Sequence, residues 1–376
     1  MRILVITHEY PLVGGGGGRV AQDLAIGFTR RGHQVRVITA HCGQLPEREE
    51  QEGVQIIRLR SARQEMFRAS LGAMLAFVPA AFFSAWRMVK KWRPDVVHVH
   101  FAVPSGAAAW LLSKFTGVPY VLTIHLGDVP GGVPEKTGRW FRWVYPFTPP
   151  IWKKAAAIAA VSSYTRSLAL KKYRVPIQVI PNGVDLETLN PGEIQVGTPP
   201  RVVFAGRMQP QKNPLLLVRC LAAVSDLPWS CTLLGDGPLL PAVKSEIGRL
   251  GLSARFDVPG WVSPEDVIEQ FRHSDLLFMP SRSEGMPIVG LHALAMGLAL
   301  VLSKVGGCVD LIEDEKNGFL LDPDDQSGFE QALHNLLSNP QRLLSFRKAS
   351  REYAQKFNLK TIVSQYEHLL KEVVIH

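Results

Sequence analysis

The feature that most constrains the fold is an alternation of apolar runs with amphipathic stretches, which starts a second time at residue 201. In the first half, strand-like runs occupy residues 2–7, 34–39, 54–59, 96–100, 120–124, 158–161 and 178–180. In the second half, they occupy residues 201–205, 230–234, 255–258, 276–279, 299–302 and 318–320. Such alternation predicts parallel sheets with right-handed crossovers. We therefore expect an α/β protein built on two sheets.

Two domains are also expected from the length, because 376 residues exceed one ordinary domain. The stretch 186–200 is rich in Pro, Gly and polar residues, which is typical of a linker. We place the domains at residues 1–186 and 187–357, followed by a helix over about residues 358–376. The apolar start of the chain, MRILVI, is interpreted as a buried first strand and not as a signal peptide.

The net charge of +9 is unevenly distributed. Residues 1–180 carry 24 Lys and Arg against 10 Asp and Glu, and the remainder is mildly acidic. A basic half suits nucleic acid, an anionic membrane or a phosphorylated substrate. No recognisable nucleic-acid module accompanies the charge, so we expect no nucleic-acid partner. The four cysteines lack C-x-x-C spacing, which disfavours a zinc site or a disulfide framework and fits a reducing cytoplasm.

The stretch 278–321 carries the clearest chemical signal. Glu284 lies in a Gly/Pro-flanked turn between an apolar strand and a small-residue helix over 289–298, and a second strand ends at the pair Gly306 and Gly307. The two turns follow parallel strands, where α/β sheets bind ligands. The N–H groups at the helix start suit a phosphate, whereas a carboxylate suits hydroxyl groups. A ligand that has both is a sugar nucleotide.

Two further segments suit phosphate. Residues 14–18 are five consecutive glycines between a strand and a helix, where the backbone can approach a pyrophosphate, although a flexible turn is the alternative. A nicotinamide enzyme would have an acid closing strand two, and this strand ends in Thr39-Ala40-His41. In FAGRMQPQKN, Arg207 and Lys212 place two cations on one turn and suit a diphosphate, with solvated loop charges as the alternative.

These segments resemble the retaining glycosyltransferases of the two-domain GT-B fold, specifically glycosyltransferase family 4 (group 1). The resemblance rests, in family order, on EYP…GGGGGRVAQDLA, TIHLGD, IPNGVD, FAGRMQPQKN, GDGP, VPGWV and residues 278–321. It implies two Rossmann-like domains whose sheets face each other across a cleft, with the last helix packed back on the first domain. It also implies a hexosyltransferase that moves a sugar from a UDP- or GDP-sugar to an acceptor hydroxyl on a lipid-linked or polysaccharide glycan.

The resemblance assigns roles residue by residue. It makes His125, Glu284, Arg207 and Lys212 catalytic, with His125 at the donor sugar and the reacting centre. It places Gly15, Gly16, Arg207, Lys212, Gly235, Val258, Glu284, Met286, Pro287, Ile288, Val289 and His292 at the donor. No acidic metal-binding motif lies beside the phosphate residues. We therefore expect neither a metal nor a cofactor other than the donor.

One position departs from the family pattern. The family usually has Glu, seven residues and a second Glu, but here the second position is His292. A neutral imidazole has one acceptor where a carboxylate accepts from both ribose hydroxyls. Either the protein is active with an altered nucleotide affinity, or it is a weakened or non-catalytic partner that binds sugar nucleotides without transferring the sugar.

The acceptor side is less defined. Asp128 either orients an acceptor hydroxyl or caps a turn, and Trp140 and Trp143 are candidate acceptor contacts. Residues 71–86 form an apolar run followed by RMVKKWR, and residues 139–154 mix aromatic and basic side chains. The first run is either a buried helix or an interfacial one. We expect a cytoplasmic protein that associates peripherally with the anionic inner face of the cell membrane.

Overall fold

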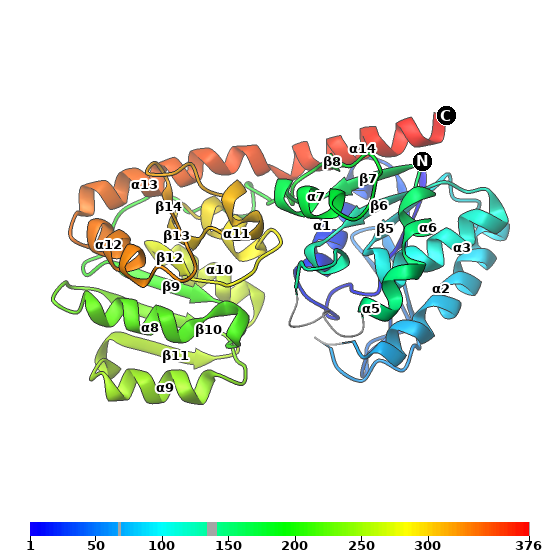
Figure 1. Ribbon diagram of the computed structural model, residues 1–376. Coiled ribbons are helices and arrows are strands. Elements are labelled where there is room, and N and C mark those ends of the chain that lie inside the picture. The colour runs from blue at the N-terminus through cyan, green and yellow to red at the C-terminus, as the bar shows by residue number, and fades with distance from the viewer. Residues whose placement is uncertain (67–68, 134–140, 376) are drawn as a thin grey trace. The chain divides into compact units, whose positions relative to one another are not determined.

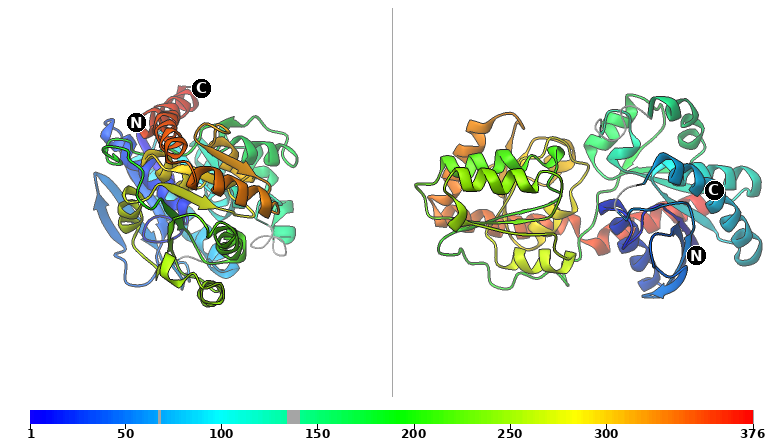
Figure 2. Two further views of the ribbon diagram at one scale, coloured as in Figure 1. Left: turned by 90° about the vertical axis from the view of Figure 1, so that its left-hand side faces the viewer. Right: turned by 90° about the horizontal axis from the view of Figure 1, so that it is seen from below.

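The computed structural model describes residues 1–66, 69–133 and 141–375 (Figure 1). The chain forms two compact units. Unit 1 comprises Met1–Gly183 and Leu359–His376, and unit 2 comprises Val184–Asn358. Each unit is a largely parallel sheet with helices on both faces (Figure 2), so the predicted α/β class is confirmed.

Unit 1 contains a sheet whose strands are, in spatial order, β3 (Arg48–Gln51), β4 (Val54–Leu59), β2 (Gln34–Ala40), β1 (Arg2–Ile6), β5 (Val96–His100), β6 (Tyr120–Ile124), β7 (Ala157–Ala160) and β8 (Gln178–Val179). Among these described strands, β3 alone pairs antiparallel. The sequence analysis missed β3 because its residues, REEQ, are all polar. Glu52 and Gly53, both with positive φ, form the two-residue turn that joins β3 to β4.

Helices cover both faces of the unit 1 sheet. They are α1 (Gly16–Arg30), α2 (Leu71–Trp92), α3 (Ala107–Thr116), α5 (Phe141–Val144), α6 (Pro149–Lys153), α7 (Ser163–Leu170) and α14 (Leu359–Ile375). The helices α2, α3 and α6 pack on the face that carries Leu4 and Ile6. The helix α14 packs on α1 and on β5 and β6.

The last helix is attached to unit 1 by both packing and charge. Glu367 accepts hydrogen bonds from Arg31 Nε at 2.6 Å and His33 Nε2 at 3.0 Å. Gly27 of α1 lies against Val363, and a Cβ at Gly27 would lie 2.4 Å from Val363 Cγ2. A side chain at that position would therefore push α14 away from α1.

Unit 2 is a six-stranded parallel sheet in the order β11 (Phe256–Gly260), β10 (Ser230–Leu234), β9 (Arg201–Ala205), β12 (Leu276–Met279), β13 (Ala299–Ser303) and β14 (Gly318–Leu321). Its helices are α8 (Pro214–Ala223), α9 (Leu240–Arg249), α10 (Pro264–Arg272), α11 (Ile288–Ala295), α12 (Gln326–Leu337) and α13 (Pro340–Tyr353). The strand order reverses between β9 and β12. Ligands of such sheets bind outside the carboxyl ends of the strands at this switch point.

The helix α11 is shorter at its carboxyl end than the predicted helix over 289–298. It ends at Ala295 because Gly297 adopts φ of +65°. Leu298 N then donates to Ala293 O at 2.9 Å, which closes the last turn. The residues after Gly297 are consequently released into β13.

The chain passes between the two units twice, at Gly183–Val184 and at Asn358–Leu359. On the unit 2 side, Val184 and Asn358 form a parallel β-bridge, and Val184 N donates to Phe357 O at 2.8 Å. On the unit 1 side, Gly183 lies against Leu359, and a Cβ at Gly183 would lie 2.8 Å from Leu359 Cδ1. The two chain crossings are therefore adjacent within each unit.

Candidate active site

The switch point of unit 2 holds an ion pair between two of the predicted catalytic residues. Lys212 ends the short 3₁₀ turn Pro210–Lys212 after β9, and Glu284 lies in the turn after β12. Lys212 Nζ lies 2.6 Å from Glu284 Oε1, and the two side chains are 16% and 7% exposed. The structure thus brings together a cation and a carboxylate that are 72 residues apart in sequence.

Two hydrogen bonds fasten the two turns to each other. Arg282 N donates to Gln211 O at 2.7 Å, and Gln211 Nε2 donates to Ser283 O at 2.8 Å. Because these hydrogen bonds join the residues just before Lys212 and Glu284, they hold the two turns that carry the pair next to each other. Such positioning is what a site needs if it is to bind a charged ligand without first reorganising.

Glycines allow the neighbouring turns to pack closely around this pair. Gly235, with φ of +132°, follows β10, and a Cβ there would lie 2.0 Å from Gly206 O. After β13, a Cβ at Gly306 would lie 1.5 Å from Glu284 O, and one at Gly307 would lie 2.0 Å from Gly285 O. The turns after β9, β10, β12 and β13 are therefore stacked backbone against backbone.

The other predicted donor contacts of unit 2 lie at the same edge of the sheet. Arg207 follows the strand end at Gly206, and its side chain is exposed. Pro287 precedes α11, so Ile288 and Val289 provide its first N–H groups, while Met286 is buried. His292 lies one turn further along α11 and is partly exposed. Val258 lies within β11, before its last residue.

In unit 1, a carboxylate occupies the glycine-rich loop. The loop follows β1, and α1 begins at Gly16. Gly15 N donates to Glu9 Oε2 at 3.0 Å. Gly14 adopts φ of +99°, and a Cβ there would lie 2.4 Å from Glu9 Cβ. An N–H group predicted to bind phosphate therefore already holds an anion from the same chain. The sequence analysis did not assign a role to Glu9, although Glu9 opens the quoted EYP motif.

His125 lies close to this loop. It follows β6, and its ring stacks on Phe101 with centroids 4.5 Å apart. A Cβ at Gly17 would lie 2.4 Å from Phe101 Cζ and 3.4 Å from His125 Cε1. Phe101 itself has φ of +72°, which is unusual for an aromatic residue. Gly17 thus leaves the space that brings His125 beside the start of α1.

A chain of polar side chains leads from His125 into the core of unit 1. His125 Nε2 lies 3.4 Å from His100 Nδ1, and the rings of His100 and His98 have centroids 4.5 Å apart. His98 Nε2 lies 2.9 Å from Thr123 Oγ1, which lies 3.4 Å from the hydroxyl of Tyr366 on α14. Burial lowers the pKa of His125 to about 4 and that of His98 to about 3. Both rings are therefore neutral at neutral pH, so His125 can exchange hydrogen bonds but does not act as a cation.

Two protein families match the parts of the chain that contain the predicted site residues. The family described as Glycosyltransferase Family 4 matches residues 14–188, and the family described as Glycosyl transferases group 1 matches residues 188–357. The chain belongs to the family 4, group 1 glycosyltransferases. The family resemblance inferred from the sequence is confirmed. This glycosyltransferase transfers sugar from a nucleotide-sugar donor.

Similar proteins are found in bacteria and archaea. An uncharacterized glycosyltransferase of Methanocaldococcus jannaschii is 24% identical, with 99% of both chains covered. D-inositol 3-phosphate glycosyltransferase of Xylanimonas cellulosilytica is 28% identical, with 94% of this chain and 92% of that protein covered. UDP-Gal:alpha-D-GlcNAc-diphosphoundecaprenol alpha-1,3-galactosyltransferase of Escherichia coli is 26% identical, with coverage of 79% and 80%.

Solved structures share the GT-B fold of this glycosyltransferase. Sucrose-phosphate synthase of Thermosynechococcus elongatus superposes with a TM-score of 0.86 at 21% identity, and 99% of each chain is covered. Anabaena HepE in complex with UDP-glucose superposes with a TM-score of 0.77 at 20% identity, with coverage of 99% and 100%. At these identities the likeness shows the fold.

Asp128 of the glycosyltransferase is held by backbone groups. Its Oδ1 accepts from Ala102 N at 2.7 Å, and its Oδ2 accepts from His125 N at 2.8 Å. Burial raises the pKa of Asp128 to about 7. Of the two roles left open by the sequence, this geometry matches the cap, which orients the backbone of His125. Trp143 is 81% exposed, and Trp140 lies outside the described residues.

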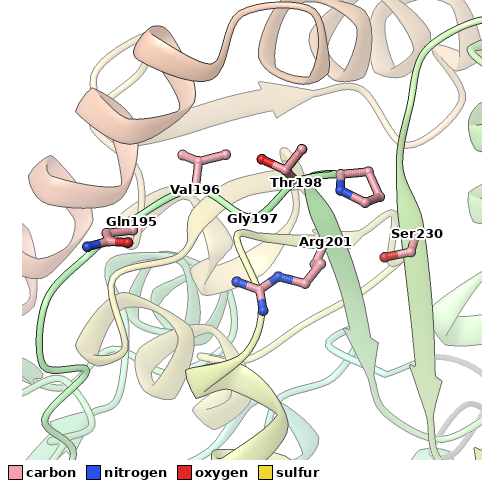
Figure 3. Close-up of a pocket in the computed structure, with 7 residues that line it drawn as sticks. Gln195, Val196, Gly197, Thr198, Arg201 and Ser230 are labelled. Carbon is pink, nitrogen blue, oxygen red and sulfur yellow. The ribbon is translucent and has the colours of Figure 1, made fainter.

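A small cavity lies at the opposite, amino-terminal edge of the unit 2 sheet (Figure 3). Its volume is about 280 Å³, and its lining includes Arg201 at the start of β9 and Ser230 at the start of β10. Asp275 ties this edge together, because its carboxylate pairs with Arg201 and with the buried Arg347. These charges stabilise the structure at the edge that lies away from the switch point.

Proposed function

We propose that the protein is a retaining hexosyltransferase that uses a UDP- or GDP-sugar. Its acceptor would be a hydroxyl of a lipid-linked or polysaccharide glycan. The observation that carries this proposal is the pairing of Lys212 with Glu284 at the switch point of unit 2. One group suits a diphosphate and the other suits sugar hydroxyls, so a single sugar nucleotide can satisfy both.

Known ligands of similar proteins support the donor and the acceptor class. The Escherichia coli relative is named for a UDP-sugar donor and a diphosphoundecaprenol-linked acceptor. Anabaena HepE has been solved with UDP, with UDP and glucose, and with UDP-glucose. We extend both ligand classes to this chain on the strength of its family membership and of the Lys212–Glu284 pair.

The chemistry centres on the departing diphosphate. Glycosyl transfer passes through an oxocarbenium-like transition state, whose negative partner is the leaving group. In unit 2, Lys212 and Arg207 stabilise this developing charge, and Glu284 holds the hydroxyls of the sugar ring. When a phosphate binds Lys212, the phosphate either shares the ammonium group with Glu284 or displaces the Glu284 carboxylate from it.

Unit 1 contributes neutral and backbone groups. Gly15 and Gly16 offer N–H groups to the donor phosphate once Glu9 has moved away from Gly15. His125 contacts the donor sugar as a neutral ring. We assign no covalent nucleophile, so the acceptor attacks from the face that the diphosphate leaves, and a phosphate oxygen takes the acceptor proton. This route gives retention of the anomeric configuration.

A stepwise assay tests the proposal. Thermal shift with UDP-, GDP- and ADP-sugars identifies the donor, and donor consumption is then followed with and without lipid-linked glycan acceptors. NMR of the anomeric proton in the product shows whether the anomeric configuration of the transferred sugar is retained. Added EDTA tests the expected metal independence. Glu284→Gln is the matched inactive control. Absence of any thermal shift and of donor consumption with all three nucleotide classes would refute the proposal.

A second candidate is a protein that binds sugar nucleotides without transferring the sugar. It is favoured by His292 alone, which stands where the family has its second Glu. Donor binding without hydrolysis or transfer, under conditions in which His292→Glu is active, would support this second function.

A further inference from the structure

The helix α2 has an unusual distribution of apolar side chains. Among the described residues, α2 is the helix long and apolar enough to cross a membrane by its length and composition. Only 28% of an apolar 18-residue stretch of this helix is buried within the structure. Leu71, Leu75, Phe83 and Trp86 of α2 are exposed, so part of its apolar surface is not covered by the core.

The inner face of α2 prevents a transmembrane arrangement. Ala73, Phe77, Ala81, Ala85 and Met88 recur at helical spacing and are buried. They pack in the core of unit 1, where α2 contacts β2 and β4. The helix could cross a bilayer only by leaving this core, so its outer face can meet a membrane only in the plane of the interface.

The outer face carries an aromatic cluster, which we define as Phe82, Phe83, Trp86 and Phe115. Phe82 is half-buried against the core, and the other three are exposed. Phe115 belongs to α3, and its exposed fraction is 66%, against 51% for Phe83. The Phe82 ring joins the two helices, with its centroid 5.2 Å from that of Phe83 and 5.9 Å from that of Phe115. The cluster is thus one contiguous surface built from two helices that pack together (Figure 1).

A basic cavity adjoins this cluster through α3, in which Lys114 directly precedes Phe115. The cavity has a volume of about 650 Å³ and lies between α3 and α6. Its lining includes Trp110, Lys114, Pro149, Pro150, Lys153 and Lys154, with no acidic residue among the described ones. We call it the lysine cavity. It combines three ammonium groups with apolar walls, and Lys114 Nζ lies 5.8 Å from the centroid of the Trp110 ring.

Charge and apolar surface together select the partner. Ammonium groups bind phosphate, and exposed aromatic rings are stabilised at the boundary between headgroups and acyl chains. A free phosphate would need the lysines but not the aromatic cluster. An anionic phospholipid in a bilayer satisfies both at once, because its phosphate and its acyl chains are adjacent.

We propose that α2, α3 and α6 form a docking surface for an anionic phospholipid bilayer. The lysine cavity takes a lipid phosphate, and the aromatic cluster enters the interface. The inference rests on the proposed function in one respect, since a lipid-linked acceptor would lie in the same bilayer.

Vesicle flotation of the full chain tests the surface. Phosphatidylcholine vesicles are compared with vesicles that also contain phosphatidylglycerol. The cavity variant is K114Q/K153Q/K154Q, and the cluster variant is F83S/F115S. The matched control, K171Q/K172Q/K348Q, removes the same charge from exposed lysines elsewhere. Thermal unfolding confirms that each variant is folded.

We expect flotation that depends on phosphatidylglycerol. Each basic residue near an anionic surface contributes about fivefold to partitioning, so the cavity variant should bind on the order of 100-fold more weakly, well beyond the control. The cluster variant should lose binding at high as well as low salt. Equal losses in cavity variant and control would overturn the cavity assignment.

Two further outcomes also decide the question. Equal flotation with pure phosphatidylcholine would overturn the role of the lysines. Binding of glycerol phosphate without flotation would make the cavity a site for free phosphate and overturn the bilayer. Donor binding should be unchanged in the cavity, cluster and control variants, because none of them changes a residue assigned to the donor. If the wild-type chain floats with the vesicles but binds no sugar nucleotide, the proposed function alone is refuted.

Discussion

Replacing Lys212 by Met tests the central ion pair most directly. The change keeps most of the length of the side chain and removes its charge, so Glu284 is left largely buried without its partner at 2.6 Å. Breaking one side of a buried pair costs about 3–5 kcal/mol, against about 0.2–1 kcal/mol for an exposed pair. Because Lys212 retains 16% exposure, we expect a loss of about 3 kcal/mol in the free energy of unfolding.

Activity should fall for a separate reason. A hydrogen bond to a charged group contributes about 1.5–3 kcal/mol, so Lys212→Met should lower kcat/KM for the donor by about 12- to 150-fold. The exposed Arg207 gives a contrast. Arg207→Ala should lower transfer by about tenfold or more and leave the free energy of unfolding nearly unchanged.

The double variant separates the two effects. In Lys212→Met with Glu284→Gln, neither charge is left alone, so stability in urea unfolding should recover relative to either single variant, whereas transfer should stay low. Steady-state kinetics and urea titration on the same four proteins read both quantities. Turnover within twofold of the wild type in Lys212→Met would refute the diphosphate role, and strictly additive stability losses would refute the coupling.

Three further predictions follow from the described contacts. His292→Glu should tighten binding of the nucleoside diphosphate in a calorimetric titration, because a carboxylate can accept from both ribose hydroxyls; weaker binding would contradict the assigned position. Glu9→Ala should raise donor affinity, because it removes the anion that occupies Gly15 N; an unchanged Kd would show that the loop does not meet phosphate. Burial lowers the pKa of His8 and His125 to about 4 and that of His98 to about 3, so the unfolded chain binds more protons than the folded protein as the pH falls below 6.5. Stability should therefore fall from pH 6.5 towards pH 4 by on the order of 1 kcal/mol per pH unit for each ring. Asp128 opposes this trend, since its raised pKa stabilises the folded state at low pH. Equal free energies of unfolding at pH 5 and pH 6.5, measured in urea, would contradict the assignment of neutral histidine rings.

Most of the parallel strands could be predicted from sequence because they are short apolar runs, and the central strands β5, β6, β12 and β13 are buried on both faces. The strand β3 could not, since its polar residues depend on pairing with β4 and on a two-residue turn. The end of α11 was also misjudged. Apolar residues continue past Ala295, and only the left-handed backbone at Gly297 stops the helix.

The candidate site was predictable as a set of turns but not as a set of contacts. Arg207, Lys212 and Glu284 follow strand ends, which sequence patterns locate well. The pairing of Lys212 with Glu284 requires β9 to lie next to β12, and local sequence patterns do not predict strand order. Likewise, Glu9 reaches Gly15 only because the chain turns back after β1. Both unforeseen contacts place one of the chain's own carboxylates on a group predicted to bind phosphate.

The adjacent chain crossings give the protein the organisation of a domain insertion. Unit 2 is one continuous segment whose first and last residues, Val184 and Asn358, are bridged to each other. Unit 1 is interrupted between Gly183 and Leu359, which lie in contact. Unit 2 is therefore an inserted domain whose two ends lie close together. It can be deleted as one segment, and a short linker can then join Gly183 to Leu359 in unit 1. Donor specificity could be exchanged between relatives by replacing unit 2 with that of another family member while unit 1 is kept.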